Sequence, residues 1–409
     1  MTARSHSAGH GRGVIDTRQE LIGALHEAAE IEHGLMIQYL FPALTMKKRL
    51  DEGITAPHLA LLRSWEATIL GVAVEEMGHL GTVCNLLAAI GEGPHFGRPN
   101  FPQTVGYYPF PFDLIEFGDE TLYRMLVFEL PRDEPLPPPP HVPAAGARAL
   151  ALAPDPLQYQ YVGELYETIR QGFEAVEEAE LFIGPSTAQV EDTWSVRLDL
   201  RPVVDRASAL AAVDDIILDG EGAPGERTGS HYDRFRTIRD QYADQSWFEG
   251  ARPVVRNPQT RLHRDADAGG TLLTHELTVQ VAELFNIAYA STLMILQQFF
   301  TAVGETPEQR EVLKGAAGQM MSTAIRPLAE VLTELPAFAG DPGPTAGPTF
   351  ELYDEVTVSP FLPARWTILL ERLAAVAGEA RSLAPVVPRA GAIGETISFL
   401  RRRIAEVAP

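Results

Sequence analysis

Three residues with side chains suited to metal binding interrupt two otherwise apolar helix faces. Residues 25–39 form one helical stripe interrupted by Glu32, and residues 69–83 form a second interrupted by Glu76 and His79. A buried carboxylate is too costly to leave unpaired, so it takes up a proton, finds a cation or binds a metal. Glu and His three residues apart on one helix, with a lone Glu on a partner helix, make half the ligand set of a carboxylate-bridged dimetal site in a four-helix bundle.

The donor atoms of these residues indicate which metal they would hold. Oxygen-rich ligation with one imidazole favours iron or manganese over zinc or copper. The sequence therefore predicts two iron ions, with manganese as the alternative. Two simpler interpretations stay open, namely that Glu76 and His79 only touch across one helical turn, or that Glu32 pairs with an arginine. Tyr39, on the face of Glu32, is a candidate catalytic residue as a hydrogen-bond partner of a ligand or an electron donor, or it only packs.

These residues lie on the first two of several predicted helices. A capping box of Thr17 and Glu20 begins the first helix near residue 17, and that helix is expected to reach about residue 50. Pro42 is expected either to kink it or to end its regular part. The second is predicted from about 57 to 90, where a Gly/Pro-rich stretch ends it. A short helix at 121–129 and a proline-rich crossover at 131–143 would carry the chain along the bundle.

Candidate ligands on the other half of the bundle are less clearly marked. In a third helix, predicted at 156–180, Glu164 and Glu167 flank the apolar stripe, and periodicity does not choose between them. In a fourth, predicted at 208–219, the line of inward residues continues to Glu221. His231 stands at the start of the next helix. Glu221 and His231 could make a second Glu/His pair, but across a loop instead of one turn.

The remaining third of the chain is predicted to be helical, at 276–300, 307–335, 363–384 and 392–407. We expect a flexible N-terminal tail at 1–14, the dimetal bundle with inserted loops at 15–262, and a C-terminal helical region packed on it at 263–409. The C-terminal region would serve as scaffold, as a wall for a small-molecule substrate, or as the subunit contact of a homodimer.

Composition excludes several classes of protein. The 409-residue chain has a net charge of −22, which argues against nucleic acid and anionic membrane as partners. Its single cysteine, Cys84, allows no intrachain disulfide and no thiolate-held cluster, which is typical of a cytoplasmic protein. No uncharged run is expected to span a bilayer, and the N-terminus lacks the apolar core of a signal peptide.

The motifs together resemble a known family. The runs Ala-Glu-Ile-Glu-His-Gly-Leu-Met-Ile-Gln-Tyr-Leu, Val-Glu-Glu-Met-Gly-His-Leu, Gly-Glu-Leu-Tyr-Glu-Thr-Ile, Gly-Glu-Gly and Ser-His-Tyr-Asp-Arg-Phe are similar to the ferritin-like domain of iminophenylpyruvate dimer synthases, which act in violacein and indolocarbazole biosynthesis. The resemblance spans residues 15–385. It implies a ferritin-like four-helix bundle, it favours Glu164 over Glu167, and it implies as metal ligands Glu32, Glu76, His79, Glu164, Glu221 and His231.

The function expected from the sequence is that of a mainly α, non-haem dimetal oxidoreductase. It would use O2 or peroxide on a small amino-acid-derived or aromatic metabolite of secondary metabolism. Members of the resembled family are much longer than this chain, so their dimerising reaction and substrate do not carry over. One alternative is a metal-binding protein that stores or detoxifies iron without an organic substrate. Another is a non-catalytic partner whose bundle holds a salt-bridge network.

Overall fold

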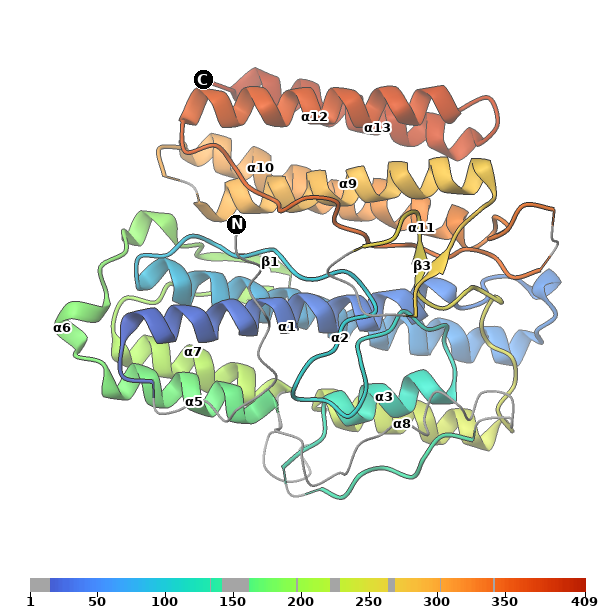
Figure 1. Cartoon of the computed structure of the whole chain (residues 1–409), viewed down its shortest axis with the longest axis horizontal. Coiled ribbons are helices and arrows are strands. Elements are labelled where there is room, and N and C mark those ends of the chain that lie inside the picture. Colours follow the sequence, from blue (N-terminus) through green and yellow to red (C-terminus); the bar gives the residue numbers. More distant parts are fainter. Residues whose placement is uncertain are drawn as a thin grey trace.

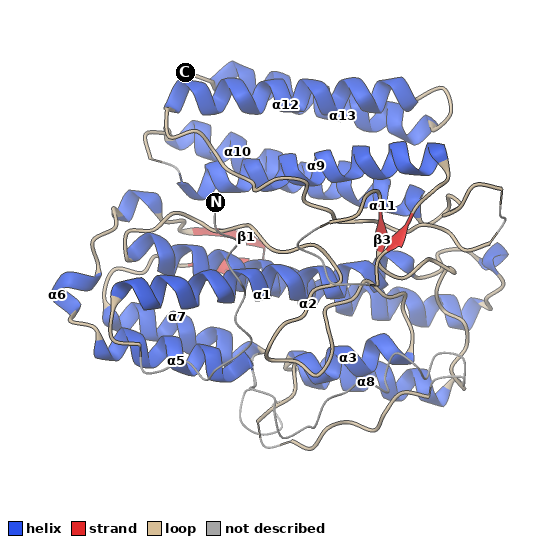
Figure 2. Cartoon of the chain, in the orientation of Figure 1, coloured by secondary structure: helices blue, strands red, loops and turns tan. Residues whose placement is uncertain are grey.

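Helices make up most of the structure, a computed structural model that describes residues 15–132, 134–141, 162–195, 198–220, 229–263, 269–301, 303–340 and 343–409. The strands of this described part form two short two-stranded pairs (Figure 2). The mainly α fold predicted from the sequence is confirmed. The tail predicted at 1–14 lies outside the described residues.

Two long helices form the central layer of the molecule (Figure 1). They are α1 (Arg18–Thr45) and α2 (Ala56–Ala89), which pack along each other. The predicted capping box begins α1, since Thr17 Oγ1 accepts a hydrogen bond from the Glu20 N–H at 3.2 Å. The prediction that this helix reaches residue 50 is wrong. It ends at Thr45, because the chain beyond Pro42 pairs with residues 250–252 and the Thr45 carbonyl accepts from the Arg252 N–H at 2.8 Å; a short 3-10 turn, η1 (Leu50–Glu52), follows.

The layer on one side of α1 and α2 consists of two pairs of short helices (Figure 1). Under one half, α5 (Val162–Ala175) pairs with α7 (Arg206–Asp219). Under the other half, α3 (Asp119–Phe128) pairs with α8 (His231–Asp244). Both α3 and α5 contact α1, and both α7 and α8 contact α2. The bundle therefore has two uninterrupted helices, α1 and α2, opposite two helix positions that are each divided between two shorter helices. One position is divided between α3 and α5, and the other between α7 and α8.

Small elements connect α5 to α7. They are the one-turn helices α6 (Glu178–Leu181) and η3 (Ser186–Ala188), followed by an antiparallel hairpin of β1 (Asp192–Ser195) and β2 (Leu198–Leu200). The strand β2 contacts α2. The second strand pair, β3 (Pro258–Gln259) and β4 (Thr271–Leu272), is parallel and precedes the C-terminal helices.

The C-terminal helices form two layers on the other side of α1 and α2 (Figure 1). The nearer layer contains α9 (Glu276–Thr301), α10 (Pro307–Met320), a π-helical segment η4 (Met321–Ile325) and α11 (Arg326–Leu332). The outer layer contains α12 (Leu362–Leu383) and α13 (Pro388–Val407). The helices predicted for this part of the chain are confirmed, with α10, η4 and α11 following one another in the range expected for one helix.

Helix α9 corrects the expectation that no apolar run is long enough for a bilayer. Within the described residues it is the helix that reaches the length and hydropathy required to span one. However, 72% of its most apolar window is buried inside the protein. It packs against α10, α11 and α12, so this hydropathy is that of a core helix.

Candidate metal centre

Two groups of buried ligand atoms meet at Glu76. In one, Glu32, Glu76 and His79 offer ligand atoms within 4.8 Å of one another, and in the other Glu76, Glu129 and His231 do the same. The two carboxylate oxygens of Glu76 divide between the histidines. Oε2 lies 2.9 Å from Nδ1 of His79, and Oε1 lies 3.0 Å from Nδ1 of His231. Glu76 therefore belongs to both groups and would be a ligand common to two metal ions.

The ligand atoms come from helix faces on one side and helix ends on the other. Glu32 projects from the middle of α1, and Glu76 and His79 project from one face of α2. By contrast, Glu129 directly follows the last residue of α3, and His231 is the first residue of α8. The break between α3 and α5 and the break between α7 and α8 therefore both lie next to this site.

Buried tyrosines hold the two outer carboxylates. The hydroxyl of Tyr166, on α5, donates a hydrogen bond to Oε1 of Glu32. The hydroxyl of Tyr39, on α1, donates to Oε1 of Glu129. In each case one carboxylate oxygen is engaged by a phenol, which leaves Oε2 for another partner.

A carboxylate also orients one of the histidines. Nε2 of His231 lies 2.9 Å from Oε2 of Glu75, and Arg234 donates to the same oxygen at 2.5 Å. Since the carboxylate must accept, Nε2 of His231 carries a proton, and Nδ1 is the nitrogen that faces Glu76 and Glu129. In the neutral ring, Nδ1 would then present its lone pair to the site. A carboxylate behind a ligating imidazole fixes both its tautomer and its ring orientation.

Several buried polar atoms at the site lack a hydrogen bond within the described part of the chain. They are Glu32 Oε2, Glu76 Oε1, Glu129 Oε2, His231 Nδ1 and His79 Nε2. Buried polar groups without partners are rare and costly, so such a cluster needs an explanation. Carboxylate and imidazole donors in this ratio suit iron or manganese, so the residues present fit a dimetal centre.

Gly220 closes this space from the end of α7. A Cβ at this position would lie 2.5 Å from Nδ1 of His231 and 2.7 Å from Oε2 of Glu129, which is too close for any real side chain. Its φ of −144° lies outside the left-handed region, so the conformation does not require glycine. The close approach of the ligand atoms explains why a residue without a side chain stands here.

The pKa values at the site are shifted because buried carboxylates are stabilised by nearby positive charge. Burial raises the pKa of Glu32 to about 7. Burial alone would lower the pKa of His79 and His231, but Glu76 beside the first and Glu129 beside the second raise it well above its ordinary value. Without metal, imidazolium protons would therefore supply the positive charge that bound ions would otherwise bring.

The structure brings together four of the six metal ligands that the resemblance implied, and it adds Glu129. Glu164 is half-buried on the first turn of α5 and joins neither group; the side chain of α5 that reaches the site is that of Tyr166. Glu167 is exposed and lies 3.3 Å from Arg132, as expected for a surface residue. Glu221 lies outside the described residues.

Glu129 was missed because it stands alone at the end of a short helix. The signal that could have found it is its position four residues after Met125 and seven after Leu122, both fully buried on α3. That spacing continues the inward face of the helix to a carboxylate. Glu129 is itself 1% exposed.

A polar cleft of about 470 Å³ reaches the centre at His79. Its walls include Glu75, Asp219 and Arg234. Oδ2 of Asp219, at the last residue of α7, lies 3.8 Å from Nε2 of His79. The centre is thus accessible to polar molecules from the side where α7 ends.

Two curated relatives match much of this chain. It is 28% identical, over 97% of its length, to dichlorochromopyrrolate synthase of Lentzea aerocolonigenes, of which the match covers 42%. It is 26% identical, over 83% of its length, to 2-imino-3-(indol-3-yl)propanoate dimerase of Chromobacterium violaceum, of which the match covers 34%. The chain therefore spans less than half the length of these relatives.

The fold and the family are shown by two further comparisons. The crystal structure of a ferritin-like protein from Caulobacter vibrioides superposes with a TM-score of 0.52, covering 83% of this chain and all of that one; at 17% identity the likeness concerns the fold alone. The ferritin-like family model matches residues 25–240, which include every residue of the two ligand groups. The match covers more than half of the sequence, and the chain belongs to the ferritin-like family.

Proposed function

We propose that this protein is a non-haem dimetal oxidoreductase in which Glu32, Glu76, His79, Glu129 and His231 hold two iron ions, with manganese as the alternative. The observation that carries the proposal is the buried cluster of carboxylate and imidazole ligand atoms on both sides of the Glu76 carboxylate, several of which lack a hydrogen bond. When bound, such a metal pair supplies the redox chemistry by which O2 or peroxide oxidises an organic molecule. Glu164 lies outside both ligand groups and Glu221 lies outside the described residues, so neither belongs to this proposed ligand set, and both stay untested predictions from the sequence.

The side chains around the ligands have distinct tasks in this proposal. Glu75 keeps Nδ1 of His231 directed at the centre through its hydrogen bond to Nε2. Tyr166 and Tyr39 hold the carboxylates of Glu32 and Glu129 and keep a proton at one oxygen of each. Through that hydrogen bond, Tyr39 would be the residue able to deliver a proton, or an electron, on the Glu129 side.

We infer that the substrate enters through the polar cleft at His79 and Asp219. That cleft is lined by Glu75, Asp215 and Asp219 and by the cations Arg201 and Arg234. The opposite side of α1 and α2 is lined with apolar side chains, which offer no polar route to the ligands. O2 or peroxide and a small polar metabolite would therefore approach from the same side.

The relatives suggest the class of substrate. One is named for dimerising an indolyl imino acid and the other for making dichlorochromopyrrolate. We accordingly propose a small aromatic, amino-acid-derived metabolite of a secondary pathway as the substrate, acted on in the cytoplasm. The chain spans less than half of either relative, and the proposal concerns the oxidation of the substrate.

An oxygen-uptake assay tests this function. Protein purified from iron-supplemented culture would be mixed with indole-3-pyruvate and ammonium, which form an imino acid in solution, and O2 or added peroxide would be followed. We expect consumption that requires both bound metal and the organic probe, and that is absent in Glu76→Ala. Consumption that requires only ferrous iron would favour iron detoxification instead.

A further inference from the structure

A second cavity lies on the opposite side of α1 and α2 from the metal centre. It measures about 410 Å³, within the range of about 300–1,000 Å³ typical of small-molecule sites. Its walls come from α1, α2, α9 and η4, with contributions from β2 and from the segments around Phe96 and Phe350. Among the described residues it shares no lining residue with the two ligand groups or with the polar cleft.

Polar groups of the cavity lining are already engaged. The hydroxyl of Thr292 donates to the Ala288 carbonyl at 2.9 Å, and that of Ser322 donates to a carbonyl of its own helix, also at 2.9 Å. Arg326, the charged residue of the lining, lies 3.0 Å from Glu66 and its side chain is 48% exposed to solvent. Within the described lining no unpaired charge is therefore available to an ionic ligand, and burying an unpaired charge would be costly.

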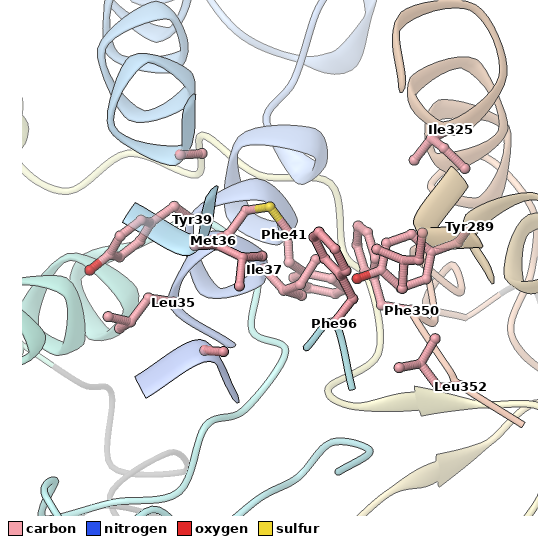
Figure 3. Close-up of a cluster of buried hydrophobic side chains, with 14 of the residues drawn as sticks. Leu35, Met36, Ile37, Tyr39, Phe41, Phe96, Tyr289, Ile325, Phe350 and Leu352 are labelled. Atoms are coloured by element: carbon pink, nitrogen blue, oxygen red, sulfur yellow. The ribbon is translucent and has the colours of Figure 1, made fainter. Parts of the chain in front are cut away.

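One end of the cavity is aromatic. The rings of Phe96 and Phe300 meet edge to face with centroids 5.6 Å apart, and those of Tyr289 and Phe350 do so at 5.3 Å. In Figure 3, Met36 lies on the side of α1 and Tyr289 and Ile325 lie on the side of the C-terminal helices, with Phe96 between them. Such walls favour a flat aromatic guest, which gains edge and face contacts that an aliphatic one does not.

A hydrogen bond fixes the tyrosine of this wall. Nδ1 of His33 lies 3.0 Å from the Phe96 carbonyl, which can only accept, so this nitrogen carries the proton. Nε2 of His33 therefore accepts from the Tyr289 hydroxyl. The ring of Tyr289 is thus held in place before any ligand arrives, as expected of a preformed site.

The rest of the wall is adaptable. Met36, Met77 and Met321 line the cavity, and unbranched methionine side chains readily adjust to the shape of a guest. The π-helical segment η4 contributes Met321, Ser322 and Ile325. π-helical turns within α-helices are rare and frequently occur at functional sites.

We propose that this cavity is a binding site for an uncharged aromatic small molecule, distinct from the metal centre. The apolar lining without an available charge selects against ions, the edge-to-face rings select a flat guest, and the methionines and η4 accommodate its outline. Binding requires none of the metal ligands, so the proposal stands independently of the redox function.

Calorimetric titration of the full chain with 2-naphthol tests the proposal. We expect 2-naphthol to bind at least ten times more tightly than 2-naphthoate, which carries the same rings with a negative charge, and more tightly than 1-octanol. Equal binding of 2-naphthol and 2-naphthoate would overturn the exclusion of ions. Equal or tighter binding of 1-octanol would overturn the aromatic preference.

Two leucines of α2 provide a matched pair of variants. Leu70 lines the cavity and Leu61 does not, and both are half-buried. Leu70→Trp should fill the cavity and weaken 2-naphthol binding at least tenfold, whereas Leu61→Trp should bind like the wild type, with circular dichroism unchanged in both. The metal-site variant Glu76→Ala should also bind like the wild type. Unchanged affinity in Leu70→Trp, or lost affinity in Glu76→Ala, would contradict the assignment.

Discussion

The two sides of the metal centre are built in different ways. On one side, Glu32, Glu76 and His79 project from uninterrupted helices, and the packing of α1 against α2 sets their positions. On the other, Glu129 and His231 stand where helices end, next to Gly220. Helix faces give precise, rigid placement, whereas helix ends depend on the segments that join them. We therefore infer that the site has a fixed half on the helix faces and a more adjustable half at the helix ends, and that variants in the two halves differ in their effect.

Removing the shared ligand should have the largest effect. Glu76 serves both halves, so Glu76→Ala should lose most of both metal ions, as measured by elemental analysis of the purified protein. Helical circular dichroism should persist, because long apolar faces, not the metal, hold α1 and α2 together. Glu167→Ala, at an exposed position, is the control and should keep its metal. Retention of both ions in Glu76→Ala would show that Glu76 is not a ligand common to the two metal ions.

Substitution on the adjustable side should remove one ion. Glu129→Gln keeps the size of the side chain but removes its negative charge, so we expect about half of the metal to be lost. Glu164→Gln is the matched comparison, because Glu164 was implied by resemblance yet lies outside both ligand groups. It should retain both ions. Metal loss in Glu164→Gln with none in Glu129→Gln would restore the ligand set implied by the resemblance.

Adding a single methyl group tests the space beside the same ligands. In Gly220→Ala the new Cβ must displace His231 or Glu129, so occupancy on that side should fall while the His79 side keeps its ion. Gly23→Ala, where a Cβ meets nothing within 4 Å, is the control. It should retain all metal and gain roughly 0.5–1 kcal/mol in free energy of unfolding, because alanine loses less backbone entropy than glycine in a helix. Full occupancy in Gly220→Ala would show that the ligands do not crowd this position.

The smallest effect is expected from the residue behind His231. Glu75→Ala leaves every ligand in place but frees the His231 ring, so metal affinity should fall by about 10–100-fold, measured by competition with a chelator. The loss should be confined to one of the two ions. An equal loss of affinity at both ions would mean that Glu75 stabilises the bundle as a whole and does not orient one histidine.

The same difference between helix faces and helix ends explains what could be predicted from the sequence. Glu32, Glu76 and His79 interrupt regular apolar stripes, and periodicity therefore predicted that they point inward together. His231 was a candidate from its place at the start of a helix, and the resemblance then implied it as a ligand. Glu129 was missed because a side chain at the end of a ten-residue helix has too short a pattern around it. Glu164 flanks its stripe on α5, where periodicity had left the choice open and where Tyr166 reaches the site instead.

The long helices of the fold followed from their apolar periodicity and from local signals such as the Thr17 capping box. The sequence did not predict that the layer opposite α1 and α2 divides into two helix pairs, α5 with α7 and α3 with α8. This division depends on contacts between segments far apart in the sequence. The end of α1 could not be predicted for the same reason. Thr45 stops the helix because it pairs with Arg252, more than two hundred residues away in the sequence.

Anomalous diffraction from crystals of the iron-loaded protein tests whether the two ligand groups hold a pair of metal ions. We expect two iron peaks separated by about 3.5–4 Å, one on each side of the Glu76 carboxylate. One should lie ~2 Å from ligand atoms of Glu32 and His79, and the other ~2 Å from ligand atoms of Glu129 and His231. A single peak, or peaks that leave Glu129 and His231 without contact to metal, would contradict it.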